Sequence, residues 1–225
     1  MERGDVALLK ADLHIHTRYS MDCQTPLDKI ITRCQELGVN CIAIADHGTA
    51  EGALEMQKIA PFKVIVAEEI LTTHGEIMGM FLKETIQGGI SPREAVKRIR
   101  AQGGLVNIPH PFETIRGSAL KDEIINEIAG DIDLMEVLNS RSPFPANTDK
   151  AKAFAAEHHI PGGAGSDAHT ILEIGNAYIE MPDFDTPQDF LKSVASGRIY
   201  GKRSGIFVHC FSVWARLKSR MRVIG

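Results

Sequence analysis

Short apolar runs alternate along the chain with stretches in which apolar residues recur every three or four positions. The short runs predict buried strands, and the longer period predicts amphipathic helices packed on them. In chain order the predicted strands are VALLKADLH, VNCIAIADH, FKVIVAEEI, EIMGMFL, LVNIPHP, IDLMEVLNSR, IPGGAGSDAH and NAYIEM.

Residue types that start and stop helices mark several of the stretches between these strands. In TPLDKIITRCQELG, Thr25 suits the N-cap, Pro26 the first helical position and Gly38 the C-terminal end. In SPREAVKRIRAQGG, Ser91 is the expected cap and Pro92 opens the first turn. The other predicted helices are a short one at 50–59, LKDEIINEIAG, NTDKAKAFAAEHH and TPQDFLKSVASG.

Strands that alternate with helices predict an α/β fold with a mostly parallel sheet. Repeated strand–helix units close most naturally into a TIM-like barrel, and an open doubly wound sheet is the alternative. No linker or low-complexity tract interrupts 1–225, so we expect one domain. Residues 206–225 combine apolar positions at helical spacing with a late basic cluster, which predicts a helix docked on the barrel. Binding to a membrane surface or to a partner is the alternative for that segment.

Composition and charge narrow the class of protein. The 225 residues are 44% hydrophobic and 24% charged, which is typical of a globular enzyme. The net charge of −4 argues against a stable nucleic-acid complex, which needs a basic footprint, but it does not exclude a nucleotide substrate. The four cysteines show no disulfide or zinc-binding spacing, and no signal peptide or long apolar span is present. We therefore expect a cytoplasmic protein with reduced thiols that does not enter the membrane.

Side chains able to bind a metal or a proton gather at the ends of the predicted strands. They are His14 and His16, Asp46 and His47, Glu68 and Glu69, His110, then Glu136, Asn139 and Arg141, and finally Asp167 and His169. In a parallel barrel all strands end on one face, where active sites of this architecture are built, so we expect these groups to converge. Buried charges without partners are costly, and bound cations would remove that cost.

The first of these pairs, His14 and His16, stands two residues apart in a strand. Alternate side chains of a strand share a face, so the two imidazoles lie roughly 6.6 Å apart along it and could grip one ion. A histidine pair on its own is more often an ordinary surface or core feature. Histidine and carboxylate groups at five strand ends favour the metal site, because these are common metal ligands.

Five segments, in order, resemble the motifs of the PHP family, named for polymerase and histidinol phosphatase domains. They are DLHIHTRYSMD, IADHGT, AEEI, IPHPF and GSDAH, and they span residues 12–169, more than two thirds of the chain. The resemblance implies a distorted (β/α)7 barrel of TIM-like type that holds two or three divalent metal ions and hydrolyses phosphate esters.

The resemblance also implies a set of metal ligands. They are His14, His16, Asp22, His47, Glu69, His110, Asp167 and His169. The implied groups are His14, His16, Glu69 and Asp167 for one metal, Glu69 and His110 for a second, and Asp22, His47 and His169 for a third.

One position departs from the family pattern. Where relatives often have a further histidine, this chain has Glu76, with His74 two residues earlier, and either could complete the second metal site. Both could also be loop-surface residues. An oxygen ligand at this position favours manganese or iron over zinc.

The expected activity is hydrolysis of a phosphate monoester or diester of a small molecule, a nucleotide or another phosphorylated metabolite, through a metal-activated hydroxide. We expect catalytic roles for Asp167, for His169, which could assist proton transfer, and for Arg141, which could bind phosphate or form a surface ion pair. The alternatives are an exonuclease on short oligonucleotides, a histidinol-phosphatase-like enzyme and a non-catalytic metal-binding scaffold. An amidohydrolase also begins with H-x-H, but it usually has a different ligand in place of Glu69.

Overall fold

The structure, a computed structural model, describes residues 8–203. Its strands are β1 (Leu9–Ile15), β2 (Cys41–His47), β3 (Lys63–Thr72), β4 (Gly75–Met80), β5 (Leu105–Ile108), β6 (Leu134–Asn139), β7 (Gly162–Gly165), β8 (Ala177–Met181) and β9 (Arg198–Gly201). Its helices are α1 (Leu27–Leu37), α2 (Glu51–Ile59), α3 (Pro92–Ala101), α4 (Asp122–Glu127), the 3-10 turn η1 (Ala129–Asp131), α5 (Pro145–Glu157) and α6 (Pro187–Ser196).

Strand β9 was not predicted, and the helix predicted at 206–225 lies outside the described residues. None of the helices within 8–203 is long and apolar enough to cross a membrane.

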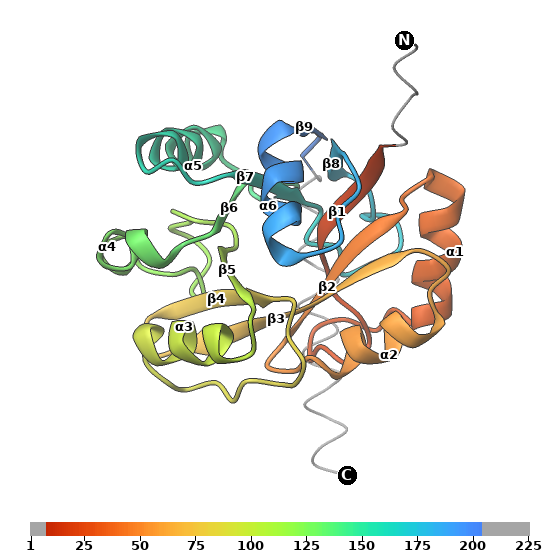
Figure 1. The fold of residues 1–225 in the computed structure, drawn as a ribbon, viewed down its shortest axis with the longest axis horizontal. Helices are drawn as coiled ribbons and strands as arrows, with labels where there is room; N and C mark the ends of the chain where they lie inside the picture. The colour runs from red at the N-terminus through yellow and green to blue at the C-terminus, as the bar shows by residue number, and fades with distance from the viewer. Residues whose placement is uncertain (1–7, 204–225) are drawn as a thin grey trace.

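All nine described strands belong to one mixed sheet in the order β7-β6-β5-β4-β3-β2-β1-β8-β9. The sheet curls until β1 meets the segment after β7, where Ile15 bridges Ala168 and the His16 amide donates to the Ala168 carbonyl at 2.9 Å. The result is a nearly closed barrel with helices α1 to α5 around its outside (Figure 1). The predicted TIM-like barrel is confirmed, and the open doubly wound sheet is wrong.

One strand of the barrel runs against the predicted direction. β4 is antiparallel to both of its neighbours, β3 and β5, because only Thr73 and His74 separate it from β3. A parallel connection needs a crossover of a dozen or more residues, so two residues can only form a hairpin. The hairpin brings the start of β4, rather than its end, to the face where the parallel strands finish. β8 and β9 add a second antiparallel pair beside β1.

Small and large apolar side chains together fill the inside of the barrel. Ala11, Ala43 and Ala67 from adjacent strands belong to one buried interior cluster. Helix α6 lies across the barrel end where the parallel strands begin (Figure 1), and its Phe190 and Val194 join that cluster. Burial of these side chains closes one end of the barrel and leaves the opposite end for polar groups.

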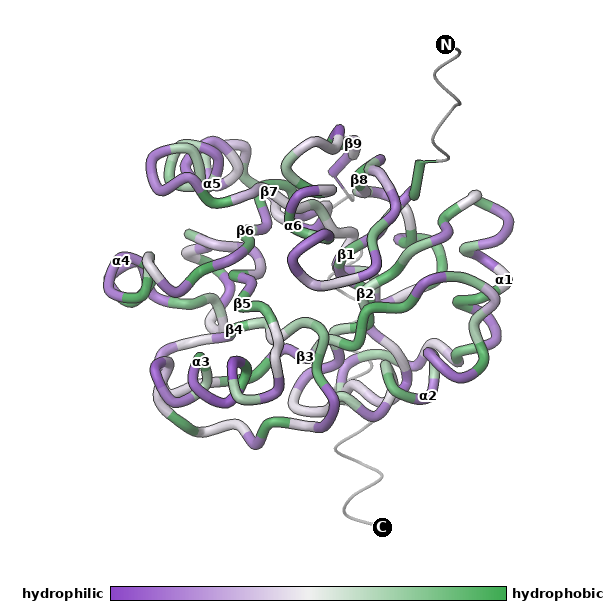
Figure 2. Tube along the Cα trace, in the orientation of Figure 1, coloured by the Kyte–Doolittle hydropathy of each residue, from purple (hydrophilic) through white to green (hydrophobic). Residues whose placement is uncertain are grey.

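The outer faces of the strands carry longer aliphatic side chains. Ile42, Ile44 and Val66 pack against the surrounding helices in a second buried cluster. Figure 2 shows hydrophobic residues along β2 and β3, with hydrophilic residues spread over the peripheral helices. A strand buried on both faces reads as a continuous apolar run, which explains why CIAIA is apolar throughout.

Helix ends follow the sequence signals with one exception. Gly38 ends α1 in the left-handed conformation at φ 66°, which glycine adopts at little cost. The Ser91 side chain caps α3 as predicted. Thr25, in contrast, is not the cap of α1: Pro26 is the N-cap. The Thr25 hydroxyl instead donates to the His169 carbonyl at 3.2 Å, which ties the loop after β1 to the loop after β7.

Candidate metal centre

The predicted ligands come together at the barrel end where the parallel strands finish. They are His14, His16 and Asp22 from β1 and the following loop, His47 from β2, Glu69 from β3, Glu76 from the start of β4, His110 after β5, and Asp167 and His169 after β7. All except the half-buried His47 are buried. Residues far apart in the chain therefore form one compact polar cluster.

A bulge in β1 aims both of its histidines into this cluster. The pairing register with β2 shifts by one residue between Asp12 and Ile15. One extra residue in a strand reverses which side chains face inward beyond it. Leu13 faces the barrel interior, so without the bulge His14 and His16 would point outward. With it, their Nε2 atoms lie 3.1 Å apart.

Glu69 lies at the middle of the cluster and reaches histidines on both sides. Its Oε1 is 2.9 Å from His110 Nε2 and 3.4 Å from His14 Nε2. Its Oε2 is 3.4 Å from His16 Nε2 and 3.3 Å from His47 Nδ1. One carboxylate can therefore serve two adjacent ions.

The second half of the cluster surrounds Asp22. Its Oδ2 is 3.4 Å from His47 Nε2 and 3.3 Å from His169 Nε2. Glu76 Oε1 lies 3.1 Å from His47 Nδ1, so the hairpin places this glutamate, and not His74, at the centre. The His74 ring instead contacts the hydroxyl of the residue before it, on the exposed turn.

Asp167 joins the cluster to a cation. Its Oδ1 is 3.2 Å from His16 Nε2, and its Oδ2 is 2.7 Å from Arg116 Nη2. Asp167 and His110 both have left-handed backbones, with φ of 53° and 30°. Such conformations are unfavourable for residues with a side chain and persist where the surrounding structure requires them, often at functional sites.

Glu136 contacts two of these ligands, His14 and His110, and fixes their orientation. Its Oε1 is 3.1 Å from His14 Nδ1, and its Oε2 accepts the His110 backbone amide at 2.6 Å. Asn139 donates to the same Oε2 at 2.9 Å and to Asp167 at 3.3 Å. When His14 Nδ1 carries the proton and donates to Glu136, its Nε2 lone pair faces the cluster, as a metal ligand requires.

Asp12 ties the loop after β7 to the first strand. Its carboxylate accepts the backbone amides of Ser166 and Gly175, both at 2.9 Å. Burial raises the pKa of Asp12 to about 6 against the opposing effect of these hydrogen bonds. Because Asp167 and His169 lie on this loop, Asp12 positions both of them.

The cluster fits divalent metal ions by its donor chemistry and its spacing. Three groups each bring their ligand atoms within 4.8 Å of one another: His16, Asp22, His47 and His169; His14, His16 and Glu69; and His47, Glu69 and Glu76. Two nitrogens bound tetrahedrally to one ion lie about 3.3–3.4 Å apart, close to the separations here. Among the described residues, Glu69 Oε2, Glu76 Oε2 and Asp167 Oδ1 are buried and receive no hydrogen bond. Such orphaned oxygens are expected where an ion supplies the missing partner.

Three residues of the cluster, His16, Glu69 and Asp167, have the charge states that metal ligation requires. Burial and then the neighbouring His169 ring lower the pKa of His16 to about 3, so this imidazole is neutral. Burial opposes ionisation of both Glu69 and Asp167. The positive charges of His14 and His47 beside Glu69, and of Arg116 and then His14 beside Asp167, outweigh burial and hold both pKa values well below the usual range. Neutral imidazole and ionised carboxylate are the ligating forms.

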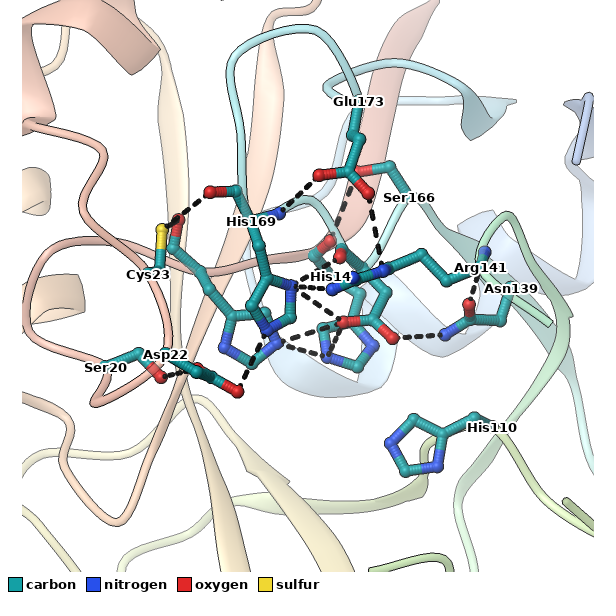
Figure 3. A network of polar contacts seen from close by, with 12 residues as sticks. His14, Ser20, Asp22, Cys23, His110, Asn139, Arg141, Ser166, His169 and Glu173 are labelled. Carbon is teal, nitrogen blue, oxygen red and sulfur yellow. Dashed lines mark hydrogen bonds and ion pairs between the residues drawn. The ribbon is translucent and has the colours of Figure 1, made fainter. Parts of the chain in front are cut away.

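Arg141 lies at the same end of the barrel as the cluster and contacts two of its neighbours. Figure 3 shows its guanidinium between Glu173 and the His169 ring. Arg141 Nε is 3.3 Å from Glu173 Oε1, and the side chain is 3% exposed. The same glutamate accepts the His169 amide at 3.2 Å. Arg141 therefore supports His169 in this structure, and contact with phosphate stays a prediction.

Two functional candidates were missed or underrated from the sequence. Glu136 was noticed as a polar group near a strand end, but its position behind His14 depends on the pairing of β6 with β7. Arg116 was not noticed at all, because it lies in the irregular segment between β5 and α4. The sequence of a loop does not indicate which strand ends its side chains will contact.

Gly165→Ala tests how closely β7 approaches the first ligand. A Cβ at Gly165 would lie 2.3 Å from His14 Cβ and 2.8 Å from Glu136 Oε1. We expect overpacking of about 1–3 kcal/mol or more, which lowers Tm by about 2–4 °C per kcal/mol in a protein of this size. Bound metal should fall with it. The control is Gly130→Ala, where a Cβ meets nothing within 4 Å. Equal Tm values for both variants in thermal unfolding would contradict this packing.

Comparison with known sequences gives consistent matches. The PHP domain profile matches residues 12–99, and a PHP-associated profile matches residues 145–199. The uncharacterized protein MJ1587 of Methanocaldococcus jannaschii is 39% identical over 145 residues, which are 59% of this chain and 82% of that protein. A second uncharacterized protein of that organism, MJ0417, is 34% identical over 194 residues, 81% of this chain and 78% of its own length.

Comparison with solved structures agrees on the fold. A two-domain protein from Bacteroides vulgatus, described as containing a predicted PHP-like metal-dependent phosphoesterase, superposes with a TM-score of 0.71 at 15% identity. The match covers 87% of this chain and 65% of the other. The described architecture is therefore shared with a second PHP-like protein despite low sequence identity.

Proposed function

The chain belongs to the PHP domain family, and from that premise we propose that it hydrolyses phosphate esters of a small molecule, a nucleotide or another phosphorylated metabolite, with bound divalent metal ions. The observation that carries the proposal is the buried cluster itself. Glu69 lies within 3.4 Å of four imidazoles and belongs to two of the three ligand groups. A purely structural role would not require so many orphaned buried oxygens at the open end of the barrel.

The protein's own residues would hold and orient the reacting groups. The three overlapping ligand groups would hold the ions, and Glu136 would keep His14 in the ligating tautomer. Metal ions in such a site supply an activated water at neutral pH and neutralise charge on phosphoryl oxygens. His169, held by Arg141 and by Glu173, would be kept in one orientation toward Asp22.

Arg116 is the cation best placed to meet a substrate phosphate. Its Nη2 rests on Asp167 Oδ2 at 2.7 Å, and its side chain is 19% exposed, so it lies between the cluster and solvent. A guanidinium has five donors, and one bond to Asp167 leaves others for phosphoryl oxygens. Asp167 would thus orient Arg116 with one oxygen and present the other to the ligands.

We expect Arg116→Ala to lower kcat/KM for the best substrate about 100-fold, or about 2.7 kcal/mol of transition-state binding. Metal content should stay unchanged, because the guanidinium is not a ligand. Arg116→Lys should recover part of the loss, since an ammonium keeps the charge without the planar fork. Steady-state kinetics with metal analysis on each variant provides the measurement.

The matched control is Arg93→Ala. Arg93 is 65% exposed and pairs with Glu127 on the outer helices, so its loss should leave kcat/KM within about twofold. A kcat/KM for Arg116→Ala as high as for Arg93→Ala would remove Arg116 from substrate binding.

A metal-reconstituted phosphatase screen tests the proposed function. The purified chain is stripped of metal, reloaded with Mn²⁺, Fe²⁺ or Zn²⁺, and assayed on nucleotides, sugar phosphates, histidinol phosphate and short oligonucleotides. Metal-dependent release of phosphate from a small ester supports the proposal. Cleavage of oligonucleotides alone would indicate an exonuclease, and tight metal binding without turnover would indicate a scaffold.

The remaining expectations about the cell biology of the protein stay predictions. We propose a cytoplasmic enzyme that meets its substrate in free solution, without a stable nucleic-acid complex. Three cysteines among the described residues, Cys23, Cys34 and Cys41, are buried free thiols.

A further inference from the structure

One ring nitrogen of the metal centre lacks the hydrogen-bond partner that a ligating histidine needs. His110 Nε2 lies 2.9 Å from Glu69 Oε1, so this nitrogen faces the cluster. The other ring nitrogen, Nδ1, is buried, and no group among the described residues forms a hydrogen bond with it. A histidine that binds a metal almost always donates its second ring N–H to a carboxylate, a carbonyl or a water. The His110 ring therefore requires an acceptor for Nδ1–H.

Two other histidines of the cluster show how the chain meets this requirement elsewhere. His14 Nδ1 lies 3.1 Å from Glu136 Oε1, and His169 Nδ1 lies 2.8 Å from the Asp167 carbonyl oxygen. Glu136 also contacts His110, but its Oε2 accepts the backbone amide there, at 2.6 Å, and not the ring. The acceptor for the His110 ring therefore has to come from another group.

A small cavity lies next to His110, between β6 and α5. Its volume is about 10 Å³, and its lining includes His110, Ser142 and Asn147, with Val137 and Ala151 as apolar walls. A cavity needs about 10–15 Å³ of this kind of volume to hold one water molecule. The space beside His110 therefore suits a single water and nothing larger.

Two further buried polar atoms without a partner belong to residues that line the same cavity. Ser142 Oγ and Asn147 Nδ2 are both buried, and neither forms a hydrogen bond within residues 8–203. Buried polar groups are nearly always hydrogen-bonded, and an unsatisfied one costs about 1–3 kcal/mol. A single small ligand between these atoms and His110 Nδ1 would satisfy all three.

We propose that one buried water occupies this cavity and holds the His110 ring in the tautomer that binds a metal. His110 Nδ1–H and the Asn147 side-chain amide donate to the water oxygen, and the water donates to Ser142 Oγ. Three hydrogen bonds are typical of a buried water. With the proton held at Nδ1, the lone pair of Nε2 faces Glu69 and the cluster. Ser142 and Asn147 are thus positioning residues that act on His110 through the water.

The chemistry of the lining favours water over an ion. His110 Nδ1–H and Asn147 Nδ2 are donors, so a cation in the cavity would face N–H groups where it needs oxygen atoms. The carboxylate of Glu136, which also lines the cavity, is already bonded to His14 and Asn139 and would repel an anion. Water both accepts and donates, which is what two donors and one hydroxyl require.

The role of this water rests on the proposed function, because the tautomer of His110 matters only if the ring binds a metal. The existence of the water site does not depend on it. The first experiment is therefore a high-resolution crystal structure of the full chain, determined both without metal and with Zn²⁺. In both crystals we expect a water at about 2.7–3.2 Å from His110 Nδ1, Ser142 Oγ and Asn147 Nδ2.

The second experiment tests the role of the water with Ser142→Ala and Asn147→Leu, which remove its two side-chain partners and keep similar volumes. The matched control is Ser193→Ala, a serine 6% exposed on α6, at the opposite end of the barrel. Zn²⁺ dissociation constants are measured by competition with a chelator. The ring resonances of ¹⁵N-labelled histidines are followed in the same titration, so that the ion bound by His110 is distinguished from the others.

Both variants should weaken binding of the ion at His110 about 10–100-fold, the usual effect of losing the group that orients a ligating histidine. The other ions should keep their dissociation constants within about threefold, and Ser193→Ala should match wild type. In the Zn²⁺-loaded variants the His110 Nδ1–H resonance should move upfield, because its hydrogen bond is lost. A change in folding stability alone would not move this resonance.

Several results would overturn the proposal. Crystals with no water between the three atoms, or with a protein group as the partner of His110 Nδ1, would remove the site. Variants that bind every ion as Ser193→Ala does would show that the water does not control the His110 ring. Equal weakening of all ions would indicate a general structural loss in place of positioning. None of these readouts uses turnover, so a failed phosphatase screen would not affect the conclusion.

Discussion

Glu69→Gln should lower kcat/KM for phosphate ester hydrolysis about 1000-fold, or about 4 kcal/mol. Glu69 belongs to two of the three ligand groups and lies within 3.4 Å of His14, His16, His47 and His110. A carboxamide removes one negative charge and turns one oxygen ligand into a donor, so adjacent ions lose their common ligand. Steady-state kinetics at saturating metal, with the metal-to-protein ratio measured on the same sample, checks both parts. We expect bound metal to fall by at least one ion per chain.

Glu68→Gln is the matched control, because it is the same substitution one residue earlier on the opposite face of β3. Glu68 Oε2 accepts the Ile86 amide at 2.8 Å, away from the cluster. Burial raises the pKa of Glu68 to about 7, so this side chain is already partly neutral near pH 7 and an amide replaces it with little change. Activity should stay within about twofold of wild type. An equal kcat/KM in Glu69→Gln and Glu68→Gln would contradict the central position assigned to Glu69.

Removal of metal should lower the thermal stability of the protein. A ligand that binds only the folded state at 100 times its Kd stabilises by about 2.7 kcal/mol per site. For a chain of this length that corresponds to a rise of about 5–10 °C in Tm for each occupied site. The physical cause is the set of buried carboxylates and imidazoles, whose mutual repulsion and missing hydrogen bonds an ion offsets. Scanning calorimetry on chelator-treated and Mn²⁺-loaded protein measures the difference.

The size of this metal effect should depend on the same glutamate pair. In Glu69→Gln the gain in Tm on adding metal should shrink by about half or more, whereas Glu68→Gln should keep it. A wild-type Tm that does not respond to chelation or to Mn²⁺, Fe²⁺ or Zn²⁺ would argue that the cluster binds no ion in the folded state. A response that is identical in both variants would place the ion elsewhere.

The sequence predicted the cluster well because its signals are local to each strand. His14 and His16 share a face by the two-residue period of any strand, and the bulge in β1 changes which face without separating them. His110 and Asp167 follow short apolar runs, so their positions depend only on where those runs end. Convergence of strand ends then follows from the barrel itself.

Other features depend on pairing and could not be read from one segment. The antiparallel direction of β4 follows from a two-residue turn, and that direction decides that Glu76, not His74, reaches His47. Arg116 belongs to an irregular loop whose path is set by tertiary contacts. The direction of the Arg141 side chain is set by Glu173, a residue that carried no motif. The sequence alone therefore could not predict the direction of these side chains.

The seam at which β1 meets Ala168 sets an order of events during synthesis. His14 and His16 leave the ribosome roughly 150 residues before Asp167 and His169, a delay of roughly 8–30 s at typical elongation rates. Until the later pair emerges, the His16 amide has no Ala168 carbonyl to bind and the first histidines lack their carboxylate partner. A nascent chain halted before residue 167 should therefore bind a divalent ion weakly. Tight metal binding would begin only when β1 has paired with the segment after β7.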